Sequence, residues 1–143
     1  MPGEPTPSPD SMTAWYWNQA AQERLVVSRC RVCGTFHFYP RPICPNCGAH
    51  ANFEWVVSSG RGSVYSFSIV RRPPSEAFAD RVPYAVCIIA LDEGVHLMSN
   101  LVNCALVDVK IGARVQVTYK DLSNGLKLPI FEVETSAERQ TKT

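Results

Sequence analysis

The sequence predicts a mainly β protein with an N-terminal helix, a ribbon stapled by a metal and a small β-barrel. Two matched Cys-x-x-Cys pairs lie close together in the first third of the chain. After them, short apolar or alternating runs follow one another, separated by turns that contain glycine. The chain has 143 residues, which suits one ordinary domain or two small ones. Small domains often need a staple because their cores bury little area.

Composition and charge narrow the class of protein. Hydrophobic residues make up 45% of the chain, which is typical of a globular protein. The formal net charge is +1, so the chain lacks the basic excess that favours binding to nucleic-acid backbones. No apolar run approaches the roughly 18 residues that span a bilayer, and the N-terminus lacks the pattern of a signal peptide. We therefore expect a cytoplasmic protein without a membrane partner, in which paired cysteines bind metal.

The pattern along the chain divides it into five segments. We expect a Pro-rich flexible tail at 1–11, a helix at 12–24, the ribbon at 25–57, the barrel at 58–135 and a second flexible tail at 136–143.

The predicted helix carries a cluster of aromatic side chains close to its start. Ser11 or Thr13 is expected to cap it, because a hydroxyl oxygen can accept from the free backbone N–H groups of the first turn. Trp15, Tyr16 and Trp17 are consecutive, so they cannot share one face. Two interpretations stay open: the helix packs entirely against its own domain, or the outward aromatics dock a partner protein.

Four cysteines form the most specific pattern in the chain. They are Cys30, Cys33, Cys44 and Cys47. Gly34 and Gly48 follow the two pairs, and glycine permits the positive φ that turns backbone N–H groups toward the sulfurs. Zinc prefers four such ligands in a tetrahedron, so the spacing predicts one Zn²⁺ per chain in a rubredoxin-like ribbon. Four thiolates leave no open position for water, which favours a structural role over a catalytic one.

Two alternatives at this site stay open. Iron bound as in rubredoxin is one, because four thiolates also suit iron. His50 is a candidate substitute ligand, although we expect both His37 and His50 to be solvated side chains on the ribbon surface.

Apolar patterning predicts the barrel. Candidate strands lie at 53–57, 64–70, 84–91, 95–102, 115–119 and 128–133. The run at 84–91 is apolar at both parities, which predicts burial on both faces. Residues 60–62 form a turn or bulge, and Asn124-Gly125 is a strong hairpin signal because both residues tolerate positive φ. Five or six short strands with few helices between them favour a barrel of the OB type.

Two further groups of residues are candidate binding sites. Phe36, Phe38 and Tyr39 lie between the cysteine pairs, where they either pack the ribbon or form part of a partner surface. Arg71, Arg72 and Arg81 flank a loop, where they either clamp phosphates such as those of coenzyme A or are ordinary solvated charges.

The sequence offers no recognisable catalytic motif. There is no nucleophile elbow, P-loop or dinucleotide fingerprint, and His96 stands alone. Cys87 lies in an apolar run and is expected in the core, whereas Cys104 is nearer a turn and more accessible. We therefore expect no catalytic residues in this chain.

The order of helix, four-cysteine ribbon and small barrel resembles a known family: zinc-ribbon plus OB-fold proteins associated with acyl-CoA enzymes. The resemblance covers roughly residues 12–134. It is carried by Cys30–Gly34, Tyr39–Gly48, Gly62–Phe67, Val82–Val86, Leu91–Gly94, Ile111–Gly112 and Pro129–Phe131.

This resemblance implies an accessory role. Members of the family assemble with thiolase-like enzymes, including lipid-transfer-type thiolases and retro-aldolases, and the partner holds the catalytic residues. The resemblance thus implies a non-catalytic, zinc-binding subunit in a hetero-oligomer that docks its partner through the helix and ribbon. The three arginines would border the acyl-CoA site of the partner.

Two other functions compete with this one. Zinc ribbons and OB folds also bind single-stranded nucleic acid, but such a module needs a basic groove with aromatic side chains, and the net charge of +1 speaks against it. An electron carrier of the rubredoxin type requires iron in place of zinc.

Overall fold

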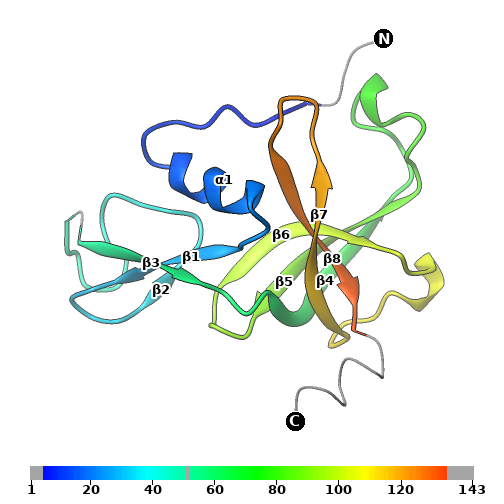
Figure 1. Ribbon diagram of the computed structural model, residues 1–143. Coiled ribbons are helices and arrows are strands. Elements are labelled where there is room, and N and C mark those ends of the chain that lie inside the picture. Colours follow the sequence, from blue (N-terminus) through cyan, green and yellow to red (C-terminus); the bar gives the residue numbers. More distant parts are fainter. Residues whose placement is uncertain (1–4, 51, 135–143) are drawn as a thin grey trace.

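The computed structural model describes residues 5–50 and 52–134, which form a three-stranded ribbon, a closed five-stranded barrel and one α-helix between them (Figure 1). The predicted fold class is therefore confirmed. The tail predicted at 136–143 lies outside the described residues. The described part of the N-terminal tail contacts the barrel, because the side-chain amide of Asn124 donates to the carbonyl of Pro7 at 3.3 Å. Within the described residues, no helix is long and apolar enough to cross a bilayer.

Helix α1 (Ala14–Ala21) is capped by an aspartate that precedes it. Oδ1 of Asp10 accepts from the backbone N–H groups of Met12 at 2.9 Å and Thr13 at 2.8 Å. The expectation that Ser11 or Thr13 supplies the cap is wrong, because the hydroxyl of Thr13 donates to the same carboxylate at 3.0 Å and makes no cap of its own. The helix lies against β1 of the ribbon and β8 of the barrel, so it contacts both units.

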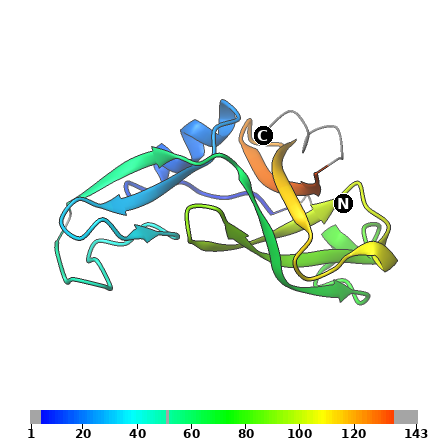
Figure 2. The same cartoon turned by 90° about the horizontal axis from the view of Figure 1, so that it is seen from below.

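The ribbon is an antiparallel sheet with strand order β2-β1-β3. Its strands are β1 (Val26–Cys30), β2 (Phe36–His37) and β3 (Phe53–Val57). The central strand β1 is almost wholly buried, with Val27 fully enclosed, and it ends at the first cysteine. The cysteine loops extend from this sheet, away from the barrel (Figure 2).

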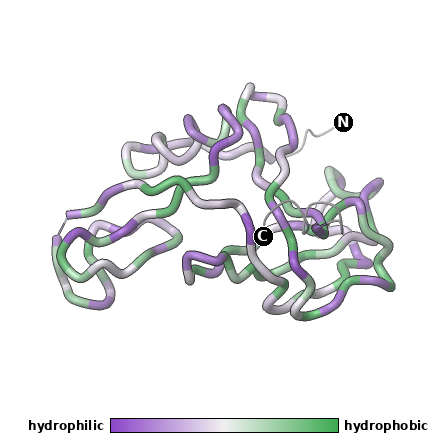
Figure 3. Tube along the Cα trace, turned by 60° about the horizontal axis from the view of Figure 1, so that its bottom comes forward, coloured by the Kyte–Doolittle hydropathy of each residue, from purple (hydrophilic) through white to green (hydrophobic). Residues whose placement is uncertain are grey.

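The barrel closes in the order β4-β5-β6-β8-β7. Its strands are β4 (Arg61–Val70), β5 (Tyr84–Leu91), β6 (His96–Val102), β7 (Arg114–Asp121) and β8 (Lys127–Val133), with short 3-10 turns η1 (Glu76–Phe78) and η2 (Leu106–Asp108) in two loops. Apolar stretches occur in both the ribbon and the barrel (Figure 3), and the buried core joins the two through Leu25 and Val27.

Strand β5 departs from expectation because it is buried on one face only. Cys87 and Ile89 are fully buried in the core, as expected for Cys87, whereas Val86 and Ile88 on the other face are half-buried. A closed barrel of five strands has one inside, so the outward residues of β5 remain available to solvent or to a ligand. The strand irregularity also lies elsewhere than expected: β4 bulges at Tyr65, while Gly60 makes a turn with φ +74°.

The parallel seam between β6 and β8 closes the barrel over a very short distance. The two strands pair only at Leu101 with Phe131 and at Val102 with Glu132. Before those pairs, the hydroxyl of Ser99 donates to the carbonyl of Pro129 at 2.9 Å. Proline has no N–H to give to a ladder, which suits a strand edge that is left unpaired.

A carboxylate clamps the linker between ribbon and barrel. Glu93, in the turn between β5 and β6, accepts from the hydroxyl of Ser58 at 2.7 Å and from the backbone N–H of Ser59 at 2.9 Å. The backbone N–H of Ser58 also donates to the carbonyl of Leu25 at 2.7 Å. These bonds fix where the ribbon lies relative to the barrel.

Candidate metal centre

The two cysteine loops are built in the same way. The N–H of Gly34 donates to the carbonyl of Cys30, and the N–H of Gly48 donates to that of Cys44, both at 2.9 Å. The two glycines have φ of +78° and +79°, a backbone region that costs other residues energy. Each loop therefore brings its pair of thiols together on one side of a tight turn, as the sequence predicted.

The four thiols converge on one point. The sulfurs of Cys30, Cys33, Cys44 and Cys47 all lie within 4.8 Å of one another. The Cys30–Cys47 and Cys33–Cys44 sulfur distances are both 3.7 Å. Sulfurs bound at ~2.3 Å around a tetrahedral zinc ion are about 3.8 Å apart, so this arrangement fits such an ion without rearrangement. Two of the four cysteines are buried and two are exposed, so the centre lies at the surface of the ribbon.

Hydrogen bonds favour thiolates in part of this group. Bonds to the side chains of Thr35, at 3.2 Å, and Asn46, at 3.5 Å, lower the pKa of Cys33 to about 5. A bond from the backbone of Ala49 lowers the pKa of Cys47, but burial and the neighbouring thiols outweigh it and raise that pKa to about 12. Four negative charges repel one another at this distance, and a divalent cation between them removes that repulsion.

His37 contacts the centre from inside the ribbon. The residue is only 6% exposed, and its Nε2 lies 3.2 Å from Sγ of Cys44. The expectation that His37 is a solvated surface residue is therefore wrong: β2 turns the ring inward, where it stacks edge-on against Phe53. His50 is exposed, as expected, and does not belong to the sulfur cluster. Sequence reasoning missed His37 because a two-residue strand gives no periodicity from which to read its facing.

The six aromatic candidates for partner contacts divide into two groups. Trp15 is 50% exposed and Tyr39 is 52% exposed. The others are partly buried, and Tyr16 and Phe38 meet edge-on at 5.5 Å between helix and ribbon. Phe36 also packs against the core and lies under the guanidinium of Arg29 at 5.5 Å, while Trp17 meets Tyr16 at 5.0 Å.

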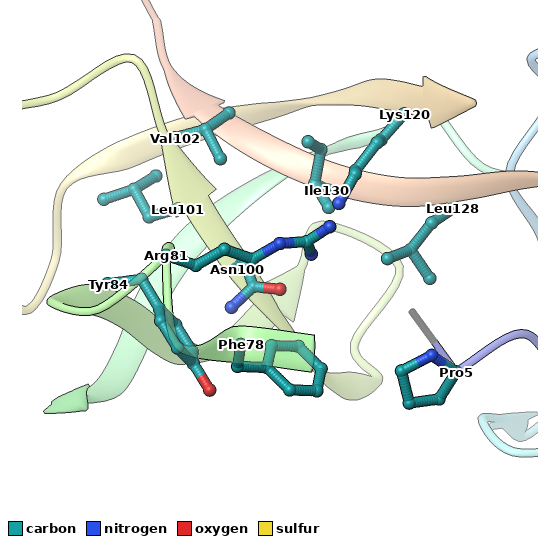
Figure 4. A pocket seen from close by; sticks show the side chains of 10 residues that line it. All are labelled: Pro5, Phe78, Arg81, Tyr84, Asn100, Leu101, Val102, Lys120, Leu128 and Ile130. Carbon is teal, nitrogen blue, oxygen red and sulfur yellow. The ribbon is translucent and has the colours of Figure 1, made fainter. Parts of the chain in front are cut away.

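The three arginine candidates also separate in space. Arg81 lines a cavity of about 360 Å³ on the barrel, next to Lys120 and Asn100 (Figure 4). Arg71 and Arg72 are exposed at the start of the same loop and do not line this cavity. The sequence gave no sign of Lys120 or Asn100, because strands that are distant in the chain bring them to Arg81.

Two family models match the chain in succession. The model described as "ChsH2, rubredoxin-like zinc ribbon domain" matches residues 17–54, and "ChsH2, C-terminal OB-fold domain" matches residues 55–120. The first match spans all four cysteines, which supports zinc as the metal for this site.

Curated relatives carry enzyme-subunit and scaffold names. A "Probable enoyl-CoA hydratase alpha subunit" of Thermomonospora curvata is 37% identical over 129 residues, which cover 89% of this chain but only 39% of that protein. The chain therefore spans well under half the length of that relative. A "DUF35 domain-containing scaffold protein" of Methanocaldococcus jannaschii is 35% identical over 78% of this chain and 79% of its own length.

A solved structure agrees with these relatives. A chain of the "Ltp2-ChsH2(DUF35) aldolase" superposes with a TM-score of 0.80 and 35% identity, covering 90% of this chain and 98% of that one. The matched domains, the full-length scaffold relative and this superposition agree with the predicted resemblance. Together they show that the chain belongs to the DUF35 family, in the ChsH2 type that joins a rubredoxin-like zinc ribbon to an OB-fold barrel.

Proposed function

We propose that this chain is a non-catalytic accessory subunit of a thiolase-like enzyme that makes or breaks carbon–carbon bonds in acyl-CoA substrates. The observation that carries the proposal is the group of four thiols within 4.8 Å of one another. A metal enclosed by four protein sulfurs offers no position to a substrate or to water, so it stabilises a fold and performs no reaction. A partner enzyme of this class is supported by the solved relative, which is named as an aldolase of two components.

The zinc ion gives the ribbon its stability. In this proposal Cys30, Cys33, Cys44 and Cys47 bind one ion per chain, and its binding free energy contributes to folding of the ribbon. The three ribbon strands are too short to hold a core of their own, since β2 has only 2 residues. The ion thereby fixes the loop that carries the exposed ring of Tyr39.

The partner surface in this proposal combines helix and ribbon. Trp15 and Tyr39 expose half of their area, and Met98 on β6 is 60% exposed. Aromatic and methionine side chains are enriched at the centres of protein interfaces, where their burial supplies most of the binding free energy. The half-buried rings behind them, such as Phe38, hold this surface in shape.

An acyl-CoA ester bound by the partner would meet this chain at the barrel loop. Arg81 enters the cavity of Figure 4, and Arg71 and Arg72 lie exposed at the other end of the loop. Guanidinium groups bind phosphates through paired hydrogen bonds, so these three residues are the candidates for contacts with coenzyme A.

The first test is co-purification of the tagged chain from its native host, with mass spectrometry and metal analysis of the same sample. We expect a thiolase-like protein in near-stoichiometric amount and about one zinc per chain. Recovery of the chain alone, or with nucleic acid, contradicts the subunit proposal. Iron in place of zinc contradicts the metal assignment.

Paired variants make the test specific. Replacing Trp15 and Tyr39 by alanine should lower recovery of the partner at least tenfold, because the interface loses its aromatic anchors. The matched control replaces Val107 and Ile111, which are 88% and 68% exposed on another loop of the barrel, and should leave recovery unchanged. Equal recovery with both pairs would exclude the helix and ribbon as the docking surface.

A further inference from the structure

Three neighbouring cavities on the barrel form one continuous groove. The first, of about 360 Å³, shares Phe78, Tyr84, Asn100 and Leu128 with a second of about 310 Å³. The second shares Met98, Leu128 and Pro129 with a third of about 370 Å³, which ends at helix α1 and the ribbon. Each has the volume of a small-molecule site, and shared walls make them one elongated space.

The groove follows the parallel seam of the barrel. Ser99 and Asn100 of β6 and Leu128 and Pro129 of β8 line it, on the stretch where the two strands have not yet paired. A hydrogen-bonded ladder normally fills the space between neighbouring strands. Here only the Ser99–Pro129 bond crosses it, so side chains and not backbone form the floor of the groove.

One end of the groove is cationic. Arg81 and Lys120 both line the first cavity, and Figure 4 shows their charged ends directed into the same space, between Phe78 and Ile130. Two cations directed into a partly apolar cavity attract an anion more strongly than they would in open solvent. The amide of Asn100, whose Nδ2 donates to the carbonyl of Ala85 at 3.0 Å, lies beside them.

The remainder of the groove is uncharged. No Lys, Arg, Asp or Glu is among the residues that line the second and third cavities. Their walls are mostly apolar and aromatic: Tyr16, Trp17, Phe38, Tyr39, Pro40, Leu97, Met98, Leu128 and Pro129 line the third. A ligand that fills the whole groove must therefore be anionic at one end and apolar along its length.

We propose that this groove binds a linear hydrocarbon chain ending in one carboxylate. The carboxylate lies between Arg81 and Lys120, where a guanidinium can donate two parallel hydrogen bonds to it. The hydrocarbon chain runs along the seam past Leu128 and Met98 toward Phe38. Two cations match a single carboxylate better than the several phosphates of a nucleotide. The inference concerns the isolated chain and does not depend on the proposed partner.

The test is calorimetric titration of the full chain with sodium decanoate and sodium hexanoate, below their micelle concentrations. Burial of a methylene strengthens binding about fourfold, so partial burial of the four extra methylenes should make decanoate bind at least tenfold more tightly. Replacing both Arg81 and Lys120 by methionine keeps the apolar stems and should weaken decanoate binding at least tenfold. The control pair Arg24→Met and Lys110→Met removes the same charge from exposed positions outside the groove and should change nothing.

A second variant tests the apolar end. Met98 is 60% exposed, so Met98→Asp is compatible with folding, and it should weaken decanoate while sparing hexanoate. Unchanged decanoate affinity in the Arg81→Met, Lys120→Met protein, or equal weakening in the control pair, overturns the proposal. Decanoyl-CoA that binds more tightly than decanoate, and loses affinity in the same pair, supports the groove and identifies a CoA ester as the source of its ligand.

Discussion

The imidazole of His37 lies 3.2 Å from Sγ of Cys44 within the ribbon and is almost fully buried. A thiolate that accepts a hydrogen bond from a ring N–H spreads its charge, which steadies its orientation toward a metal ion. The same sulfur also accepts from the backbone N–H of Cys47 at 3.5 Å. Cys44 is therefore held from two sides, and His37 supplies the only one of these bonds that a side-chain substitution can remove.

Replacing His37 by phenylalanine should lower zinc affinity roughly 10-fold or more, because groups that orient metal ligands typically contribute a factor of 10–100. Phenylalanine keeps the packing against Phe53 but cannot donate a hydrogen bond. Competition with a chromogenic chelator measures the affinity. His50→Phe at an exposed position is the matched control, and equal losses in the two variants would contradict a specific role for His37.

The cysteine ligands were predictable from sequence, but His37 and the groove were not. A Cys-x-x-Cys-Gly loop is a local structure whose geometry depends on a few consecutive residues, so Cys30 and Cys44 reveal it directly. The facing of His37 depends on how β2 pairs with β1. Lys120 reaches Arg81 only because the barrel closes, and that closure is a property of the whole strand order.

At the scale of single elements, the start of α1 shows how a pattern can mislead. The sequence offers three capping residues within four positions, and the hydrogen-bond network selects Asp10. Similarly, the apolar run of β5 is compatible with a strand buried on both faces. In the barrel its outward face instead carries Val86, which lines the proposed groove.

The cap should make helix stability dependent on pH. Hydrogen bonds from the backbone and side chain of Thr13 hold the pKa of Asp10 below its ordinary value of 3.8. A carboxyl whose pKa is lower in the folded state stabilises that state above pH 3.8 and loses the effect as the pH falls through its folded pKa. Asp10→Ala should therefore have a lower melting temperature than the parent at pH 7. The gap should close in strong acid, as followed by circular dichroism, and a constant gap would argue against the carboxylate as the cap.

Another element-scale contact ties the start of β4 to the end of β8. Nε of Arg61 donates to Glu134 at 2.8 Å, and the side chain of Glu134 is only 1% exposed. Arg61→Met should cost about 3 kcal/mol, because it leaves a buried carboxylate without its partner. Adding Glu134→Gln should restore most of that loss. Urea unfolding measures both, and a double variant as unstable as the single one would show that the charge is not the cause.

For the whole molecule, the position of the ribbon depends on one carboxylate. Glu93 bonds both Ser58 and Ser59 in the linker. Glu93→Ala should let ribbon and barrel reorient independently, which NMR relaxation detects as two rotational correlation times. Glu76→Ala, on an exposed loop, is the control. A single correlation time in the Glu93 variant would mean that the shared core through Leu25 suffices to hold the two units together.

The barrel is a ring with one weak joint. Four of its five strand contacts are antiparallel, and the fifth, between β6 and β8, has two paired residues. Transient opening at that joint leaves the other ladders intact, so it needs far less free energy than unfolding the barrel. Backbone amides of β8 that face β6 should consequently exchange with deuterium sooner than those of β5, whose two neighbours enclose it. Anything that enters the joint would slow that exchange and act as a latch on the ring.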